Sequence, residues 1–292
     1  MNQKARAIMT DVDIETIVRL SRDLRNAAAT MSEAEARFIV DAYYLIQEDR
    51  KRSANQIHAM KEEPHSLLTW FFSQNKMLES QLKAALGRYS DGKKVGRWMQ
   101  SIVGIGPVIS AGMLAHIDIN ECPTAGHIWR FAGFDPTVKW EPKTRRPWNA
   151  ALKTLCWKTG QSFMKQSGND NCLYGKLYRQ RKGYEVTRND RGDNAEIAAK
   201  ILTERKFAKT TDAFKHLTSG HLPPAQIDAR ARRWAVKMFL SHLQNVWWWD
   251  AKGKLPPAPY SIGIKGHVDY IPPPNINEMF PDLALALRGK ND

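Results

Sequence analysis

The sequence predicts a mostly α-helical fold, and three observations lead to this prediction. Apolar residues recur every three or four positions in several long segments, which is the spacing of one helix face. No region is rich in strand patterns, and no internal repeat is visible. Ser32 followed by Glu35 is a capping-box pattern, which marks the start of a helix.

The N-terminal region, residues 1–90, is predicted to contain two long helices. Residues 13–62 have helical spacing, Pro64 marks a break, and residues 66–89 carry a second apolar stripe. Two consecutive amphipathic helices predict a helical hairpin or coiled-coil region. Alternatively, the apolar stripes form the interface of a homo-oligomer.

The core domain is predicted to cover residues 91–250. One helix ends near Val103 and the next begins at Pro107, and further helices are expected at 124–133, 149–166, 194–218 and 228–250. Residues 167–193 are predicted to be loop-rich and basic, or instead a charged helix with its tyrosines turned inward. Prolines after this domain predict an extended tail, 251–292, docked on the body.

The charge of the chain favours a polyanionic partner. The 292 residues include 44 Lys and Arg against 30 Asp and Glu, a net charge of +14. Such cations neutralise phosphates and release condensed counterions, so nucleic acid is the first candidate and an acidic membrane surface the second. There is no bilayer-spanning apolar run and no signal-peptide segment, and the three cysteines are few and odd in number. We therefore expect an intracellular, cytoplasmic protein.

The segment SIVGIGPVISAGMLAHI, residues 101–117, predicts a tight turn followed by a helix with small side chains. Gly104 and Gly106 permit positive φ at no steric cost. Ile105 lies between them as a hydrophobic plug, and Pro107 fits the first position of a helix. The turn is either a corner that packs closely or a loop whose backbone N–H groups approach a phosphate.

This pattern resembles the helix-hairpin-helix motif, which binds the DNA backbone without regard to sequence. The resemblance implies DNA contacts from four positions in the loop and the turn after it: Gly104, Ile105, Gly106 and Val108. We therefore expect the core domain to be a helix-hairpin-helix DNA-binding domain. The alternative is a hairpin that packs only against protein.

Three basic clusters are the other candidate DNA contacts. The irregular segment 139–149 contributes Lys139, Lys143, Arg145 and Arg146. The segment 167–193, in which tyrosines alternate with cations, contributes Lys176, Arg179, Arg181 and Lys182. The start of the helix at 228–250 contributes Arg230 and Arg233.

The order of these motifs resembles a known family. SIVGIGPVISAGMLAHI, TAGHIWRFAGFDP, a basic segment and PWNAALKTL follow one another as in the C-terminal domain of Piv/MooV-type insertion-sequence transposases, which are guided by a bridge RNA. The resemblance covers roughly residues 66–165 and 228–250. It implies DNA recombination on a mobile genetic element and a bacterial or phage origin.

Two departures from the family pattern bear on catalysis. The family begins with an α/β nuclease-like domain that holds metal ions, whereas the N-terminal residues here have helical patterns. The family also places a catalytic serine in the basic segment, which here reads KTRRPWN and offers only Thr144 as a hydroxyl. We therefore expect a DNA-binding protein without its own catalytic site. The alternatives are an active recombinase with a partner or unrecognised site, and an RNA-binding or scaffold protein.

No cofactor or metal site is predicted. His116, Asp118, Cys122 and His127 lie close in sequence, but their spacing fits no metal-ligand pattern and structural roles are expected. No phosphate-binding loop, dinucleotide fingerprint or nucleophile elbow occurs. The expected partners are duplex or branched DNA, with RNA as an alternative, a second copy of the chain through the N-terminal helices, and no membrane.

Overall fold

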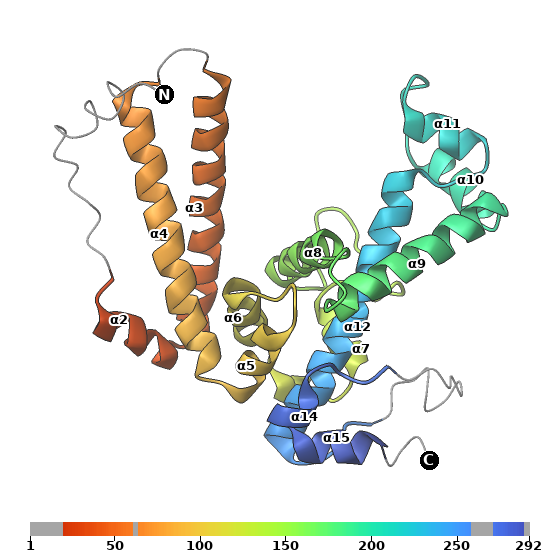
Figure 1. The fold of residues 1–292 in the computed structure, drawn as a ribbon. Coiled ribbons are helices and arrows are strands. Elements are labelled where there is room, and N and C mark those ends of the chain that lie inside the picture. The colour runs from red at the N-terminus through yellow and green to blue at the C-terminus, as the bar shows by residue number, and fades with distance from the viewer. Residues whose placement is uncertain (1–19, 61–63, 258–270, 289–292) are drawn as a thin grey trace. The chain divides into compact units, whose positions relative to one another are not determined.

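The computed structural model describes residues 20–60, 64–257 and 271–288, and every regular element within these ranges is a helix (Figure 1). The predicted mostly α-helical fold is confirmed. The chain divides into two compact units, Met1–Lys93 and Lys94–Asp292, which are described separately. None of the helices in the described ranges is long and apolar enough to cross a membrane.

The first unit is built on two long helices that pack side by side, α3 (Glu33–Ala59) and α4 (Ser66–Asp91). They are preceded by α2 (Arg22–Ala27) and by a 3-10 turn, η1 (Ala28–Thr30). One carboxylate joins the two long helices, because Glu79 of α4 accepts hydrogen bonds from Tyr43 and Gln47 of α3 over 3.1 and 2.9 Å. The predicted helix over 66–89 is confirmed as α4.

The predicted single helix over 13–62 is wrong, because the chain is interrupted at Met31 and Ser32. Ser32 forms the expected capping box with Glu35: its hydroxyl accepts the Glu35 N–H, and the Glu35 carboxylate accepts the Ser32 N–H. A residue that caps a helix cannot also lie inside one, so the capping pattern marks the true start of α3. Residues 13–19 and 61–62 of the prediction lie outside the described residues.

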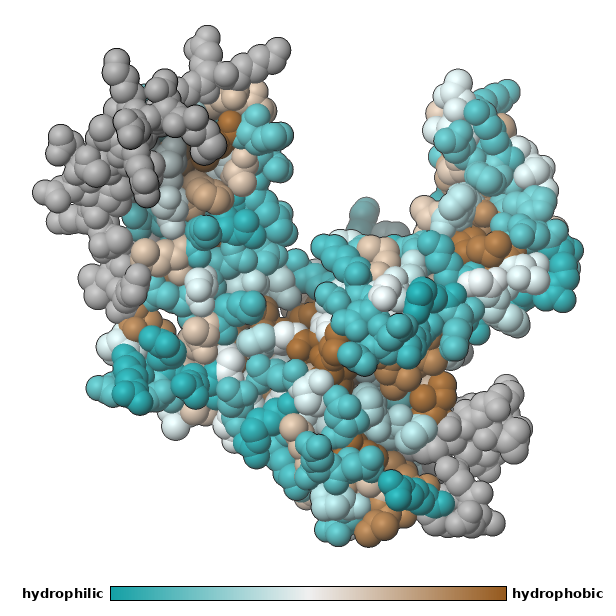
Figure 2. Space-filling view, in the orientation of Figure 1, coloured by the Kyte–Doolittle hydropathy of each residue, from teal (hydrophilic) through white to brown (hydrophobic). Residues whose placement is uncertain are grey.

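The second unit is organised around α12 (Pro224–Lys252), which packs against α5, α7, α8 and α9. The other elements are, in chain order, α5 (Lys94–Ser101), α6 (Pro107–His116), η2 (Ile119–Glu121), α7 (Ala125–Phe131), α8 (Ala150–Lys165), α9 (Leu173–Asp190), α10 (Ala195–Glu204), α11 (Asp212–Thr218), α14 (Ile276–Met279) and α15 (Pro281–Arg288). Hydrophilic residues cover most of the face of this unit that Figure 2 shows, with apolar residues mainly between helices.

Three aromatic rings form the centre of the second unit. Phe163 of α8, Tyr174 of α9 and Phe239 of α12 are fully buried, and their ring centroids lie 4.8 to 5.8 Å apart. Aromatic pairs at this separation add to the stabilisation that comes from area burial. These contacts fix the axes of α8, α9 and α12 relative to one another, and all three helices contribute to the candidate site.

Two predictions for the region between α8 and α12 are wrong. The segment predicted as loop at 167–193 contains α9, so the alternative of a charged helix holds, with Tyr174 and Tyr178 buried and Tyr184 exposed. The helix predicted over 194–218 is instead α10 and α11, because the chain leaves the helix at residues 205–211.

The C-terminal part differs from the predicted extended tail. α12 ends at Lys252 with Gly253 in the left-handed conformation, and the tail is docked as expected, since Trp98 donates its indole N–H to the carbonyl of Pro274 over 2.7 Å. However, the described residues 271–288 form α14 and α15. These helices are stabilised by burial of Phe280 and Leu283 against the body.

Candidate nucleic-acid interface

The loop between α5 and α6 contains two glycines, and one of them, Gly104, adopts positive φ. Gly104 has φ of +100°, which side chains rarely tolerate. Gly106 has φ of −97° and ψ of 176°, so it does not adopt the positive φ that a glycine permits. Ile105 is buried as the predicted plug, and Val108 is buried too, so neither side chain is available to a ligand.

The loop is held from behind by α8 and by the start of α9. The hydroxyl of Ser162 donates to the carbonyl of Gly104 over 2.6 Å, and the thiol of Cys172 donates to that of Val103 over 3.2 Å. A side chain at position 104 would lie 3.2 Å from the ring of Phe163. The loop conformation is therefore set by the packed helices rather than by solvent.

The other side of the loop is open at Gly106. A β-carbon added there would meet no atom within 4 Å. Gly106 is the N-cap of α6, Pro107 occupies the first helical position, and among the described residues no side chain caps this helix start. Its backbone N–H groups and the positive end of the helix dipole are available to an anion.

The basic segment 139–146 lies on the surface, and its cations Lys139, Lys143, Arg145 and Arg146 are all exposed. A turn positions them: the indole N–H of Trp140 donates to the carbonyl of Thr144 over 3.0 Å, and the hydroxyl of Thr144 donates to the carbonyl of Glu141 over 2.7 Å. The guanidinium of Arg146 lies over the Trp140 ring at 5.5 Å. The hydroxyl of Thr144 is thus committed to a backbone bond.

A second basic site, which we call the basic pocket, lies between the loop after α7 and the helices α9 and α12. It has a volume of about 500 Å³, and its basic lining residues are Arg181, Arg188, Arg230, Arg233 and Lys237. Three of these were predicted DNA contacts. Arg188 and Lys237 were not among the predicted contacts, although Arg188 follows Arg181 by seven positions and Lys237 follows Arg233 by four, and both spacings keep residues on one helix face.

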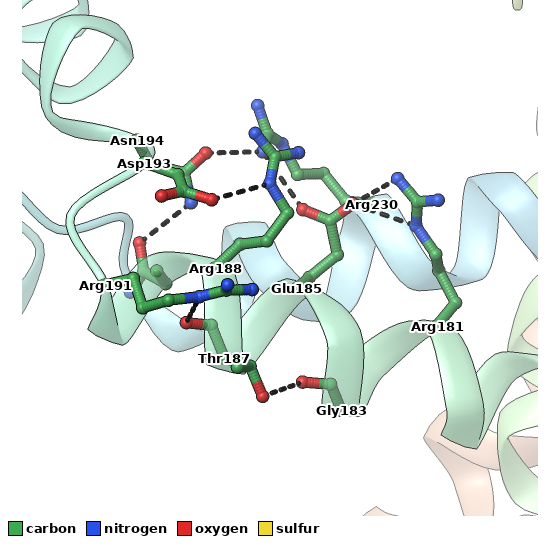
Figure 3. Close-up of polar contacts among 10 residues, drawn as sticks. Arg181, Gly183, Glu185, Thr187, Arg188, Arg191, Asp193, Asn194 and Arg230 are labelled. Carbon is green, nitrogen blue, oxygen red and sulfur yellow. Dashed lines mark hydrogen bonds and ion pairs between the residues drawn. The ribbon is translucent and has the colours of Figure 1, made fainter.

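The buried carboxylate of Glu185 organises this pocket (Figure 3). Its side chain is 2% exposed, and it accepts hydrogen bonds from Arg181 Nε over 2.9 Å and from Arg230 Nη1 over 3.2 Å. Arg230 also donates to Asn194 Oδ1 over 3.0 Å, and Arg188 donates to Asp193 over 3.3 Å. These bonds hold three guanidinium groups in fixed positions.

The other predicted contacts on α9 do not line the basic pocket. Lys182 forms an ion pair with Asp228 over 3.3 Å, and its pKa is raised by the hydrogen bonds that it donates to Tyr178 and Asp228. Arg179 lies 3.9 Å from Asp170, and Lys176 is half-buried. The predicted set therefore divides into the loop, the basic segment, the basic pocket and these three separate cations.

The four residues considered for a metal site, His116, Asp118, Cys122 and His127, line one pocket together. Among the described residues, no group of three or more His, Cys, Asp and Glu side chains is arranged to hold a metal ion. His127 bonds to Thr124 over 2.9 Å. Burial raises the pKa of the Cys122 thiol to about 11, so it stays protonated and weakly nucleophilic at neutral pH.

Comparison with known proteins gives one match, and it falls on the first part of this site. Residues 96–153 match the model of the transposase IS116/IS110/IS902 family. This segment is similar to those transposases. The transposase-like segment contains most of α5, the loop at Gly104 to Gly106, α6, α7 and the basic segment 139–146. No curated protein and no solved structure matches the chain.

The match supports a domain in the middle of the chain that is related to the C-terminal domain of these transposases, and a transposase-related function. It agrees with the resemblance found in the sequence over the same motifs. The match does not extend to guidance by a bridge RNA, which the resemblance to the Piv/MooV type implies. The basic pocket lies largely outside the transposase-like segment, which contributes only the wall formed by residues 133–136.

Proposed function

We propose that this chain is a transposase-related protein that binds the DNA backbone through the loop before α6 and the basic surface around it. The observation that carries the proposal is the uncapped start of α6 at Gly106, open to solvent and inside the transposase-like segment. A phosphate can approach this backbone to hydrogen-bonding distance because no β-carbon stands in front of it. Recognition of this kind reads no bases and works on duplex or branched DNA.

The charge distribution supports the same partner. The exposed cations of the basic segment neutralise phosphates beside the loop, and the chain as a whole carries a net charge of +14. Contacts with phosphate dominate affinity for nucleic acid and make it strongly dependent on salt. The buried side chain of Ile105 anchors the loop, and its own N–H donates to the Ile102 carbonyl over 2.9 Å, so the N–H groups open to a ligand are those at the start of α6.

We further propose that the chain alone binds DNA without cleaving it. In the Piv/MooV-type pattern the basic segment carries a catalytic serine, and this segment offers only Thr144. The Thr144 hydroxyl donates to the Glu141 carbonyl, and no general base is bonded to it among the described residues. A second candidate function, DNA recombination by this chain, is favoured by the family match itself. Nicking of supercoiled plasmid with Mg²⁺ or Mn²⁺ would establish that second function.

A binding titration tests the proposed function. Labelled duplex, four-way junction and RNA of equal length are titrated with the protein at 50 and 200 mM salt. We expect the DNA affinity to fall on the order of 10³-fold between these salt concentrations if about six phosphates are neutralised. An affinity that does not change with salt, or binding to RNA alone, would contradict a DNA-backbone function.

A further inference from the structure

The basic pocket has more positive charge than its own carboxylates neutralise. Of the described residues that line it, five are basic and two, Asp135 and Glu185, are acidic. Glu185 is fully engaged by Arg181 and Arg230. Asp135 accepts hydrogen bonds from the N–H and the hydroxyl of Thr137 over 2.9 and 2.7 Å. The charge of Glu185 is therefore shared by two arginines, whereas the charge of Asp135 acts on Lys237 without a direct ion pair.

Arg233 and Lys237 are the two lining cations that donate no hydrogen bond to these carboxylates. Within the described part of the chain neither forms an ion pair, and the ammonium of Lys237 lies over the Trp129 ring at 4.0 Å. Burial, together with the charges of Arg230 and Arg232, lowers the pKa of Arg233, and burial also lowers the pKa of Lys237. A bound anion would oppose both shifts, because its negative charge offsets the repulsion that Arg230 and Arg232 exert on the exposed Arg233 and stabilises the charge of the half-buried Lys237.

The cations and an aromatic ring share one helix face. Arg230, Arg233, Trp234 and Lys237 follow one another at spacings of three, one and three along α12, so their side chains leave the helix on the same side. On α9, Arg181, Glu185 and Arg188 have helical spacing too, and α9 packs against α12. The half-buried Trp234 ring has the Arg181 guanidinium 5.8 Å from its centroid.

The size of the pocket fits more than a phosphate. A volume of about 500 Å³ lies in the range of sites that hold a small organic ligand. Phe134, in the turn that follows Gly133, adds a second aromatic side chain to the wall. A site with cations for a phosphate, an aromatic ring for stacking and room for both matches one nucleotide. A paired base inside a duplex cannot enter such a concave site.

We infer that the basic pocket binds one unpaired nucleotide of a DNA strand, its phosphate between Arg233, Arg230 and Lys237 and its base against Trp234. The inference rests on the proposed function, since it takes DNA as the ligand. It adds a preference for DNA with an unpaired base, which a site that contacts only the backbone does not have. The pre-set positions of Arg181 and Arg230 around Glu185 reduce the ordering that binding requires.

The test compares three labelled duplexes that differ at one position: fully paired, with a single bulged nucleotide, and with a bulged abasic site that keeps the phosphate. The wild-type protein is expected to bind the bulged duplex about tenfold more tightly than the paired one, because one stacked base contributes on this scale. The abasic bulge should lose most of this gain. Adenosine monophosphate at millimolar concentration is the competitor that tests for a free nucleotide as the ligand.

Two variants locate the preference in the pocket. Trp234→Leu should abolish the preference for the bulge and leave the affinity for paired duplex unchanged. Arg233→Gln should weaken binding to the bulged duplex and reduce its salt slope by about one. Arg179→Gln, which removes an exposed cation of α9 outside the pocket, should leave the preference intact. Thermal melts show which variants are folded. If Trp234→Leu does not fold, Arg233→Gln alone tests whether the preference for the bulge arises in the pocket.

The outcomes separate this inference from the proposed function. Tight binding of paired duplex without any preference for the bulge overturns the pocket inference alone. A preference that survives both Trp234→Leu and Arg233→Gln overturns it as well, because the preference then arises elsewhere. Binding of the mononucleotide with no preference among the duplexes overturns the assignment to a DNA strand. If no duplex binds, the proposed function and the inference fall together.

Discussion

Ser162 donates its hydroxyl hydrogen to the carbonyl oxygen of Gly104 over 2.6 Å, and this bond joins the last turn of α8 to the loop that precedes α6. The two residues are far apart in sequence, yet the bond and the neighbouring Phe163 ring define the conformation of the loop. The backbone that faces solvent at Gly106 is therefore oriented before any ligand arrives.

Replacing Ser162 with alanine should destabilise the second unit by about 1 kcal/mol, because the loop loses one side-chain hydrogen bond. The melting temperature should fall by about 2–4 °C for a unit of this size. Thr154→Ala is the matched control, since the Thr154 hydroxyl is exposed on the same helix and bonds only to the helix backbone. Equal melting temperatures for Ser162→Ala and the wild type would show that the bond does not hold the loop.

Gly104→Ala should be more damaging than the loss of that bond. The alanine would have to adopt φ of +100°, and its β-carbon would lie 3.2 Å from the Phe163 ring. Strain of this kind costs about 1–3 kcal/mol. Urea unfolding measures the loss. A variant as stable as the wild type would mean that the loop relaxes to a conformation other than the one described.

Stability should depend on pH through His242. The carbonyl of Ile271 can only accept, so the Nε2 of His242 carries the hydrogen and Nδ1 accepts from the Tyr174 hydroxyl over 2.8 Å. Burial lowers the pKa of His242 to about 4, while the unfolded chain takes up this proton near pH 6.5. Stability is thus fully present above about pH 6.5 and falls as the pH drops toward 4.

The expected loss is about 2 kcal/mol between pH 7.5 and pH 5, because the unfolded state binds one more proton over most of this interval. Unfolding by urea at the two pH values measures it. His242→Gln is the control, because it removes the titrating group. The free energy of unfolding of the wild type should exceed that of His242→Gln by about 2 kcal/mol less at pH 5 than at pH 7.5. A constant difference would argue against a neutral buried imidazole.

The double variant Arg145→Ala with Arg146→Ala should weaken DNA binding and reduce the salt slope by nearly two, because each guanidinium neutralises one phosphate in the proposed complex. Both side chains are exposed, so the melting temperature should stay the same. Arg52→Ala in the first unit removes a comparable exposed cation and serves as the control. An unchanged salt slope would exclude the basic segment from the interface.

Local signals in the sequence were enough to predict several elements of this fold. The apolar stripe of α4, the start of α8 at Asn149 and the end of α7 at Gly133 depend on periodicity and capping, which neighbouring residues encode. α9 was predicted only as an alternative to a loop, because its buried residues lie mostly in its first half and its sequence contains two glycines. Its helix is stabilised by tertiary contacts of Tyr174 and Tyr178 that no local pattern shows.

The same limit applied to the candidate site. The sequence identified Gly104, Gly106 and most of the cations, because their types and spacing are visible along the chain. It did not predict that Arg181 and Arg230, which are distant in sequence, meet at Glu185. Nor did it predict that Gly106 has ordinary backbone angles and is distinctive only for the open space in front of it.

The central claim is that DNA is bound at the start of α6, and the open space at Gly106 allows its most direct test. The test is the affinity of Gly106→Ser for duplex DNA at low salt, measured beside a thermal melt. A serine fits the observed φ of −97°, and its β-carbon meets no atom within 4 Å, so as an N-cap it should keep or raise the melting temperature. Its hydroxyl would take the helix N–H groups that a phosphate uses, so we predict an affinity loss of about tenfold or more. A stable serine variant that binds duplex DNA as tightly as the wild type would contradict the claim that DNA is bound at the start of α6.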